Sequence, residues 1–139
     1  MGHAVRILHT AKTVTTGGRD PGAARSSDGL LDIRLAAPGS ARMGANPEQL
    51  LAVAWSASFA SAIAAAARRQ GIVLPAGTAI EAEVDLCQAG DGCFLRPRLA
   101  VGLPGLDRAL ARTLVDEARQ TCAYCKATNG NVEVAIDLV

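Results

Sequence analysis

The chain has 139 residues, of which half are hydrophobic and only 3% are aromatic, and its formal net charge is +1. This length fits one domain with a single core. The 14 basic and 13 acidic residues nearly balance, and few aromatic rings are present to stack on bases. These features argue against nucleic acid or an anionic membrane surface as a partner. We therefore expect one globular domain over residues 1–139.

Predicted strands and loops alternate in the first third of the chain. Residues 3–16 carry several β-branched side chains, which predicts a strand. The Gly-rich residues 17–22 predict a turn or loop with a permissive backbone. Residues 29–35 alternate apolar and polar side chains and predict a second strand, and residues 36–45, rich in Pro, Gly and Ser, predict a linker.

A long helix is predicted from Pro47 to about Gln70. Asn46 is a favourable N-cap, Pro47 suits the first helical position, and Glu48 favours the positive end of the helix dipole. Residues 50–67 carry no charge, and these 18 residues reach the lower limit of membrane-spanning length. Their small Ala and Ser side chains and the flanking caps favour a buried helix instead. Because this helix is apolar on all sides, we expect a second subunit to cover part of it.

The second half of the chain predicts two strands, a helix and a final strand. Residues 78–87 and 93–103 predict strands joined by a Gly-containing hairpin loop. Residues 107–121 have apolar side chains at helical spacing, and residues 131–139 alternate as a strand does. The order ββ-α-ββ-α-β with short connections predicts an α+β fold with a mainly antiparallel sheet.

Cys122 and Cys125 form a CxxC motif, the sharpest chemical feature of the sequence. The N-terminal segment lacks the features of a signal peptide, so we expect a cytoplasmic location, where structural disulfides are rare. The CxxC spacing allows a disulfide over a short loop, and a nearby cation such as Arg19 would favour a reactive thiolate. The alternative interpretation is a pair of half-buried structural thiols.

Cys87 and Cys93 flank the predicted hairpin loop. Facing hairpin positions can bring two sulfurs together, although disulfide geometry is demanding. All four cysteines could instead form a metal site, but five residues separate this pair, more than the usual ligand spacing. The favoured interpretation is two inert thiols, and neither a metal nor a cofactor is expected.

Five ordered segments add a further signal, and they extend over most of the chain: Thr16-Gly17-Gly18-Arg19, Asn46-Pro47-Glu48-Gln49-Leu50, Leu103-Pro104-Gly105-Leu106-Asp107, Cys122-Ala123-Tyr124 and Ala127-Thr128-Asn129-Gly130-Asn131. Together they resemble the organic hydroperoxide resistance (Ohr) branch of the OsmC/Ohr family. The resemblance implies an OsmC-like α+β fold with two main helices in an intertwined homodimer.

The resemblance also implies a two-cysteine reduction of alkyl or fatty-acid hydroperoxides. A peroxidatic thiolate becomes a sulfenic acid, and a resolving cysteine captures it as a disulfide. Small dithiols or lipoylated proteins then reduce that disulfide, without a bound cofactor. By the same resemblance, Cys122 is the resolving cysteine, Arg19 stabilises the thiolate and Glu48 holds Arg19.

The sequence departs from the family at the peroxidatic cysteine, whose position corresponds to Ser58. A serine hydroxyl stays protonated and cannot form a sulfenic acid. Cys125 stands where the family has a serine, Ala123 replaces a proline and Asn129 replaces an arginine. Either Ser58 was introduced to trap an ordinary peroxidase, or the protein is a natural variant whose redox chemistry has moved to Cys122 and Cys125.

We expect a thiol-dependent organic hydroperoxide peroxidase that protects against oxidative stress. One alternative is a catalytically altered relative that binds apolar ligands in an inherited pocket, and the other is a CxxC thiol–disulfide protein. Ser58 argues against peroxidase activity, whereas Arg19 and Glu48 argue for it. The candidate catalytic residues are Arg19, Glu48, Ser58, Cys122 and Cys125.

Overall fold

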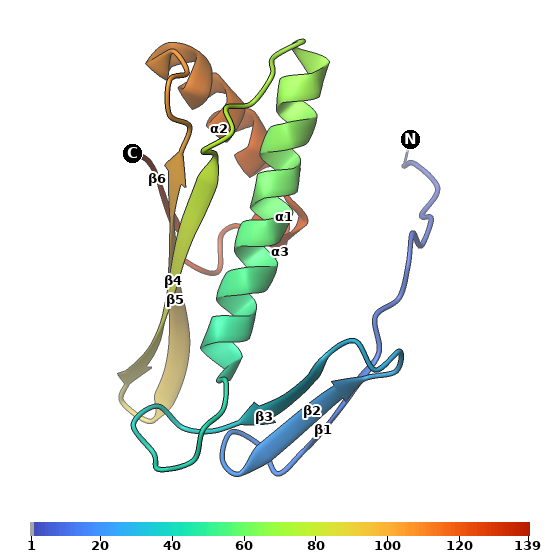
Figure 1. The fold of residues 1–139 in the computed structure, drawn as a ribbon, viewed down its shortest axis with the longest axis vertical. Coiled ribbons are helices and arrows are strands. Elements are labelled where there is room, and N and C mark those ends of the chain that lie inside the picture. The colour runs from blue at the N-terminus through green and yellow to red at the C-terminus, as the bar shows by residue number, and fades with distance from the viewer. Residues whose placement is uncertain (1) are drawn as a thin grey trace. The chain divides into compact units, whose positions relative to one another are not determined.

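The computed structural model describes residues 2–139, which form six strands and three helices in two compact units (Figure 1). The first unit ends at Pro47, and the second extends from Glu48 to Val139. The α+β class, the mainly antiparallel strand pairing and the two main helices are confirmed. The single domain and the homodimer stay predictions.

The first unit contains a three-stranded antiparallel sheet of β1 (Thr13–Thr16), β2 (Gly22–Ser26) and β3 (Asp32–Leu35), in that order. The strand predicted over residues 3–16 is wrong before Thr13, because the residues preceding Thr13 pair with no other strand in the described part of the chain. The strand β2 was not predicted, because its Ala, Arg and Ser side chains carry little strand propensity.

The helix α1 (Pro47–Arg69) confirms the predicted long helix to within one residue. Its buried side chains form one stripe at mostly four-residue spacing: Trp55, Phe59, Ile63, Ala66 and Ala67. The helix ends in a Schellman motif, in which the Ile72 N–H donates to the Ala67 carbonyl oxygen at 2.9 Å. Gly71 has a φ of 68°, the left-handed conformation that this cap requires.

By length and composition alone, α1 could also cross a membrane, with 33% of its most apolar window buried. The core helix of a soluble protein can have the same length and composition. The buried stripe of α1 packs with residues of β5 and α2, which supports the core-helix interpretation. The absence of a membrane partner stays a prediction.

The second unit contains a three-stranded sheet in the order β4-β5-β6. The strands β4 (Ala79–Ala89) and β5 (Gly92–Gly102) form a long antiparallel hairpin with only two residues in its turn. The short strand β6 (Ala135–Leu138) pairs parallel to β5, because the chain returns through a helical crossover. It confirms the last predicted strand, but only over its final part.

The crossover consists of α2 (Arg108–Thr121) and α3 (Ala123–Thr128). Asp107 caps α2 by accepting the Leu110 N–H at 3.1 Å, and the helix predicted over residues 107–121 is confirmed. The helix α3 was not predicted, because its six residues are too few to show helical periodicity.

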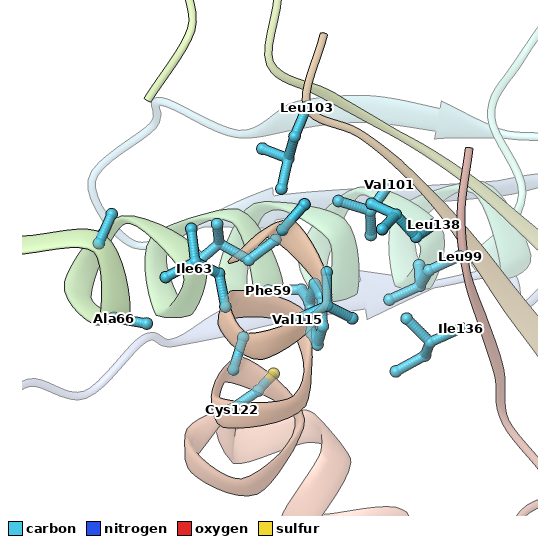
Figure 2. Close-up of a cluster of buried hydrophobic side chains, with 14 of the residues drawn as sticks. Phe59, Ile63, Ala66, Leu99, Val101, Leu103, Val115, Cys122, Ile136 and Leu138 are labelled. Carbon is cyan, nitrogen blue, oxygen red and sulfur yellow. The ribbon is translucent and has the colours of Figure 1, made fainter. Parts of the chain in front are cut away.

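One cluster of buried apolar side chains joins α1, α2 and the β4–β5–β6 sheet (Figure 2). Phe59, Leu114 and Val101 contribute from α1, α2 and β5, and each is fully enclosed. Burial of side chains of this size contributes about 1.5–3 kcal/mol each. Cys122 belongs to the same cluster and is 2% exposed, so the core fixes the position of its sulfur.

Candidate active site

The CxxC motif lies at the junction of α2 and α3. Cys122 ends α2, where its backbone N–H donates to the Ala118 carbonyl oxygen at 2.8 Å, and the same residue is the N-cap of α3. Cys125 lies within the first turn of α3. Both side chains are free thiols, with Cys122 buried and Cys125 half-buried. The motif therefore lies at the C-terminal end of the second long helix.

Ser58 of α1 contacts this motif directly. The Cys122 thiol donates a hydrogen bond to the Ser58 hydroxyl, with 3.8 Å between Sγ and Oγ. The two residues are 64 positions apart in sequence, so packing of α1 against the end of α2 brings them together. The structure therefore unites Ser58, Cys122 and Cys125 of the predicted set in one place.

Two aromatic residues complete this group. Trp55 lies one helical turn before Ser58 and is 2% exposed, and its ring centroid is 6.1 Å from that of Tyr124. We call these five residues the dithiol cluster: Trp55, Ser58, Cys122, Tyr124 and Cys125. Trp55 and Tyr124 were not predicted as site residues. The signals were available, since Trp55 is at helical spacing from Ser58 and Tyr124 lies inside the CxxC motif.

The environment of Cys125 disfavours its thiolate. Burial is the largest cause and raises the pKa of the Cys125 thiol above its ordinary value, and the neighbouring Cys122 acts in the same direction. The Trp55 indole and, more weakly, the Arg119 charge oppose this rise in pKa. The indole N–H approaches Cys125 without a hydrogen bond of normal geometry, and it is buried with no partner among the described residues.

The other two cysteines do not form a comparable pair. In the β4–β5 register Cys87 faces Phe94 and Cys93 faces Gln88. Because adjacent strand residues point to opposite faces of a sheet, the Cys87 and Cys93 side chains lie on opposite faces. The alternative of a cross-strand disulfide between facing cysteines is therefore wrong. Among the described residues, no group of three or more His, Cys, Asp or Glu side chains is arranged to hold a metal ion.

Arg19 and Glu48 belong to different units. Arg19 lies in the loop between β1 and β2, and Glu48 lies in the first turn of α1. Their pairing with each other and with the dithiol cluster stays a prediction.

The loop that carries Arg19 has a tightly defined backbone. A Cβ atom on Gly17 would lie 2.0 Å from the Pro21 carbonyl oxygen, and one on Gly22 would lie 1.9 Å from the Gly18 oxygen. Only glycine permits these close approaches. The Asp20 carboxylate also accepts the Ala37 N–H at 3.1 Å. The Gly-rich segment, predicted as a permissive loop, is thus needed for close backbone packing beside Arg19.

Comparison with known proteins supports the resemblance over the whole chain. The family described as OsmC-like protein matches residues 38–137. An organic hydroperoxide resistance protein of Xanthomonas axonopodis pv. citri is 39% identical over 137 residues, covering 96% of each chain. Organic hydroperoxide resistance protein OhrB of Bacillus subtilis is also 39% identical, over 94% of this chain and 98% of the relative.

Solved structures show the same fold. The crystal structure of OhrB of Bacillus subtilis matches with a TM-score of 0.89 and 38% identity, covering 96% of this chain and all of that one. A structure of an organic hydroperoxide resistance protein from Legionella pneumophila matches with a TM-score of 0.88 and 35% identity, covering 96% and 98%. The chain belongs to the OsmC/Ohr family, in its organic hydroperoxide resistance branch.

Proposed function

We propose that the protein is a thiol-dependent peroxidase for organic hydroperoxides, with Cys125 and Cys122 as its working thiols. The observation that carries the proposal is the contact of Cys122 with Ser58. By the family resemblance Ser58 corresponds to the peroxidatic cysteine, so the contact supports a redox role for the CxxC motif. The names of the relatives, organic hydroperoxide resistance proteins, support the substrate class.

Cys125 is the attacking thiol in this scheme, because it is the more exposed of the two. Its thiolate attacks the terminal oxygen of ROOH, the O–O bond breaks, and ROH leaves after taking up a proton. The resulting Cys125 sulfenic acid reacts with the Cys122 thiol, which forms the S–S bond and releases water. Two electrons pass from the dithiol to the peroxide, and an external dithiol or lipoyl group returns them.

The apolar surroundings of the dithiol cluster support an organic hydroperoxide as the substrate, and they require a cation near the attacking thiol. An apolar site suits the alkyl group of an organic hydroperoxide, but it also raises the pKa of the Cys125 thiol. A cation is needed to favour the thiolate. We assign that role to Arg19 and the orientation of Arg19 to Glu48. The Ser58 hydroxyl accepts a hydrogen bond from the Cys122 thiol, and it can donate one instead when Cys122 is a thiolate.

A second candidate function is thiol–disulfide exchange without peroxide chemistry. Ser58 favours it, because the oxygen at this position cannot form a sulfenic acid, while Cys122 and Cys125 remain free to exchange disulfides. We further propose that the protein acts in the cytoplasm as a homodimer, in which the partner subunit covers part of α1.

The test is peroxide consumption measured together with intact mass. The reduced protein is treated with a slight excess of an organic hydroperoxide, and peroxide loss is then followed with a dithiol present. We expect catalytic loss of peroxide and a decrease of two hydrogen masses that peptide mapping assigns to Cys122 and Cys125. Unchanged peroxide and unchanged mass would contradict the peroxidase proposal.

A matched variant, Ser58→Cys, separates the interpretations. If the parent protein is inactive and Ser58→Cys consumes peroxide, an ordinary two-cysteine peroxidase underlies the chain and Ser58 silences it. If the parent protein reduces a model disulfide but not the peroxide, thiol–disulfide exchange is the function. If neither the parent protein nor Ser58→Cys catalyses either reaction, apolar-ligand binding remains as the alternative.

A further inference from the structure

A cavity of about 510 Å³ opens beside the dithiol cluster, entirely within the second unit. It is bounded by the end of α2, by α3 and the loop that follows it, and by β6. Cys125 is part of its lining, whereas Cys122 is not. A ligand in the cavity can therefore reach the half-buried Cys125 sulfur, whereas the buried Cys122 sulfur does not line it.

The charged side chains that line this cavity are positive. Arg119 of α2 and Lys126 of α3 both line it, and no Asp or Glu does so in the described chain. The Arg119 Nη2 donates to the Val134 carbonyl oxygen at 3.0 Å, which ties the guanidinium to the segment leading into β6. A guanidinium has five N–H donors, so Arg119 keeps donors for a ligand after making this bond. The cavity is suited to an anionic group.

The remaining wall of the cavity is partly apolar. Val132, Val134 and Ile136 contribute aliphatic side chains from the segment that ends in β6. Ligand sites commonly combine such apolar walls with a few polar groups that fix orientation. A ligand that fits this cavity therefore has a short aliphatic portion and an anionic end.

We propose that this cavity binds the external reductant, a small thiol with an aliphatic chain and a carboxylate. The inference rests on the proposed function, because it requires the Cys122–Cys125 disulfide that the peroxidase cycle forms. The carboxylate pairs with Arg119 and Lys126, and the aliphatic chain lies against Val134 and Ile136. This placement directs the thiol to the sulfur that lines the cavity.

The exchange then proceeds from Cys125. The reductant thiolate attacks the Cys125 sulfur, the Cys122–Cys125 bond breaks, and Cys122 leaves as a thiolate that takes up a proton. The Ser58 hydroxyl, 3.8 Å from Cys122, can donate to this leaving sulfur. A second thiol of the reductant attacks the mixed disulfide and frees Cys125. The protein gains two electrons, and the reductant becomes a disulfide.

The test compares two reductants that differ only in charge. Dihydrolipoate carries a carboxylate, and dihydrolipoamide carries a neutral amide on the same aliphatic dithiol. The protein is oxidised to the Cys122–Cys125 disulfide, and the return of free thiols is followed at low ionic strength. We expect dihydrolipoate to react about three- to tenfold faster, with the advantage falling as salt is added.

The charge of the cavity is then removed. Arg119→Gln with Lys126→Gln should lower the rate with dihydrolipoate until it equals the rate that the same variant shows with dihydrolipoamide. The matched control is Arg96→Gln with Arg112→Gln, which removes the same charge from exposed residues that do not line the cavity. This control should keep the preference. Equal rates of the parent protein with both reductants would overturn the proposal. An equal loss of the preference in the control variant would also overturn it.

The oxidant used to prepare the disulfide separates this proposal from the proposed function. Oxidation by an organic hydroperoxide tests the peroxidase chemistry, and oxidation by diamide forms the disulfide without it. If only diamide works, the peroxidase proposal fails and the charge preference can still be measured. If both oxidants work and no preference is found, the cavity proposal alone fails.

Discussion

Cys122 and Cys125 lie at the junction of α2 and α3, whereas Cys87 and Cys93 lie near the turn of the β4–β5 hairpin. The first pair meets beside Ser58 and the buried core, with one buried and one half-buried sulfur. The second pair points to opposite faces of the sheet. Sequence spacing alone therefore does not decide whether two cysteines can act together, because the backbone between them decides it.

The largest expected effect is on peroxide turnover. If Cys122 and Cys125 are the working thiols, Cys125→Ser and Cys122→Ser should each lower turnover at least about 100-fold. The double variant Cys87→Ser with Cys93→Ser should retain turnover within about twofold, because neither residue belongs to the dithiol cluster. Peroxide consumption with a dithiol reductant measures both. Comparable losses for the two pairs would remove the functional difference between them.

The next largest effect is on the free energy of unfolding. It compares the packing beside the dithiol cluster with the packing in the β4–β5 hairpin. Phe59 follows Ser58 and is fully buried, so Phe59→Ala should lower the free energy of unfolding by about 3–5 kcal/mol. Leu86 lies in the hairpin and is 47% exposed, so Leu86→Ala should cost about 1 kcal/mol or less. Urea unfolding measures both. A similar loss at the two positions would contradict the placement of the core beneath the dithiol cluster.

The sequence predicts the two long helices better than it predicts the short elements β2 and α3. The capping residues and apolar spacing of α1 and α2 predict both helices closely, because these signals are local. The short elements β2 and α3 leave almost no periodic signal, and their formation depends on neighbours that the sequence does not identify. The CxxC spacing predicts that Cys122 and Cys125 are close. The contact of Cys122 with Ser58 could be predicted only from the family resemblance, since the two residues are 64 positions apart in sequence.

Thiol labelling at different pH values sharpens the comparison further. Cys93 is exposed, and Cys122 is buried, so an alkylating reagent at neutral pH should label Cys93 first and Cys122 last. Burial raises the pKa of the Cys125 thiol, so its thiolate fraction is depressed at neutral pH and increases as the pH rises. The labelling rate of Cys125 should therefore keep rising into the alkaline range. Quantitative peptide mapping follows each cysteine separately, and a Cys125 rate that levels off near neutral pH would contradict this prediction.

The smallest effect concerns Trp55, whose indole N–H is buried and makes no normal hydrogen bond in the described chain. This N–H is close enough to Cys125 to favour its thiolate, which lowers the pKa of the thiol against the effect of burial. In Trp55→Phe the thiolate loses that donor, so the pKa of Cys125 should rise further. Its labelling rate at neutral pH should fall by roughly twofold to tenfold.

The rate for the exposed Cys93 in the same sample controls for reagent and pH. The rate for the buried Cys122 controls for folding, because an unfolded or loosened variant would label Cys122 faster. Trp55→Phe should slow Cys125 alone and leave Cys93 unchanged. Tyr124→Phe keeps the ring that faces Trp55 and changes no donor to Cys125, so it should leave both rates unchanged. If Trp55→Phe and Tyr124→Phe behave alike, the indole acts only by packing. A selective change at Cys125 would instead show that a single buried N–H tunes one thiol of the pair.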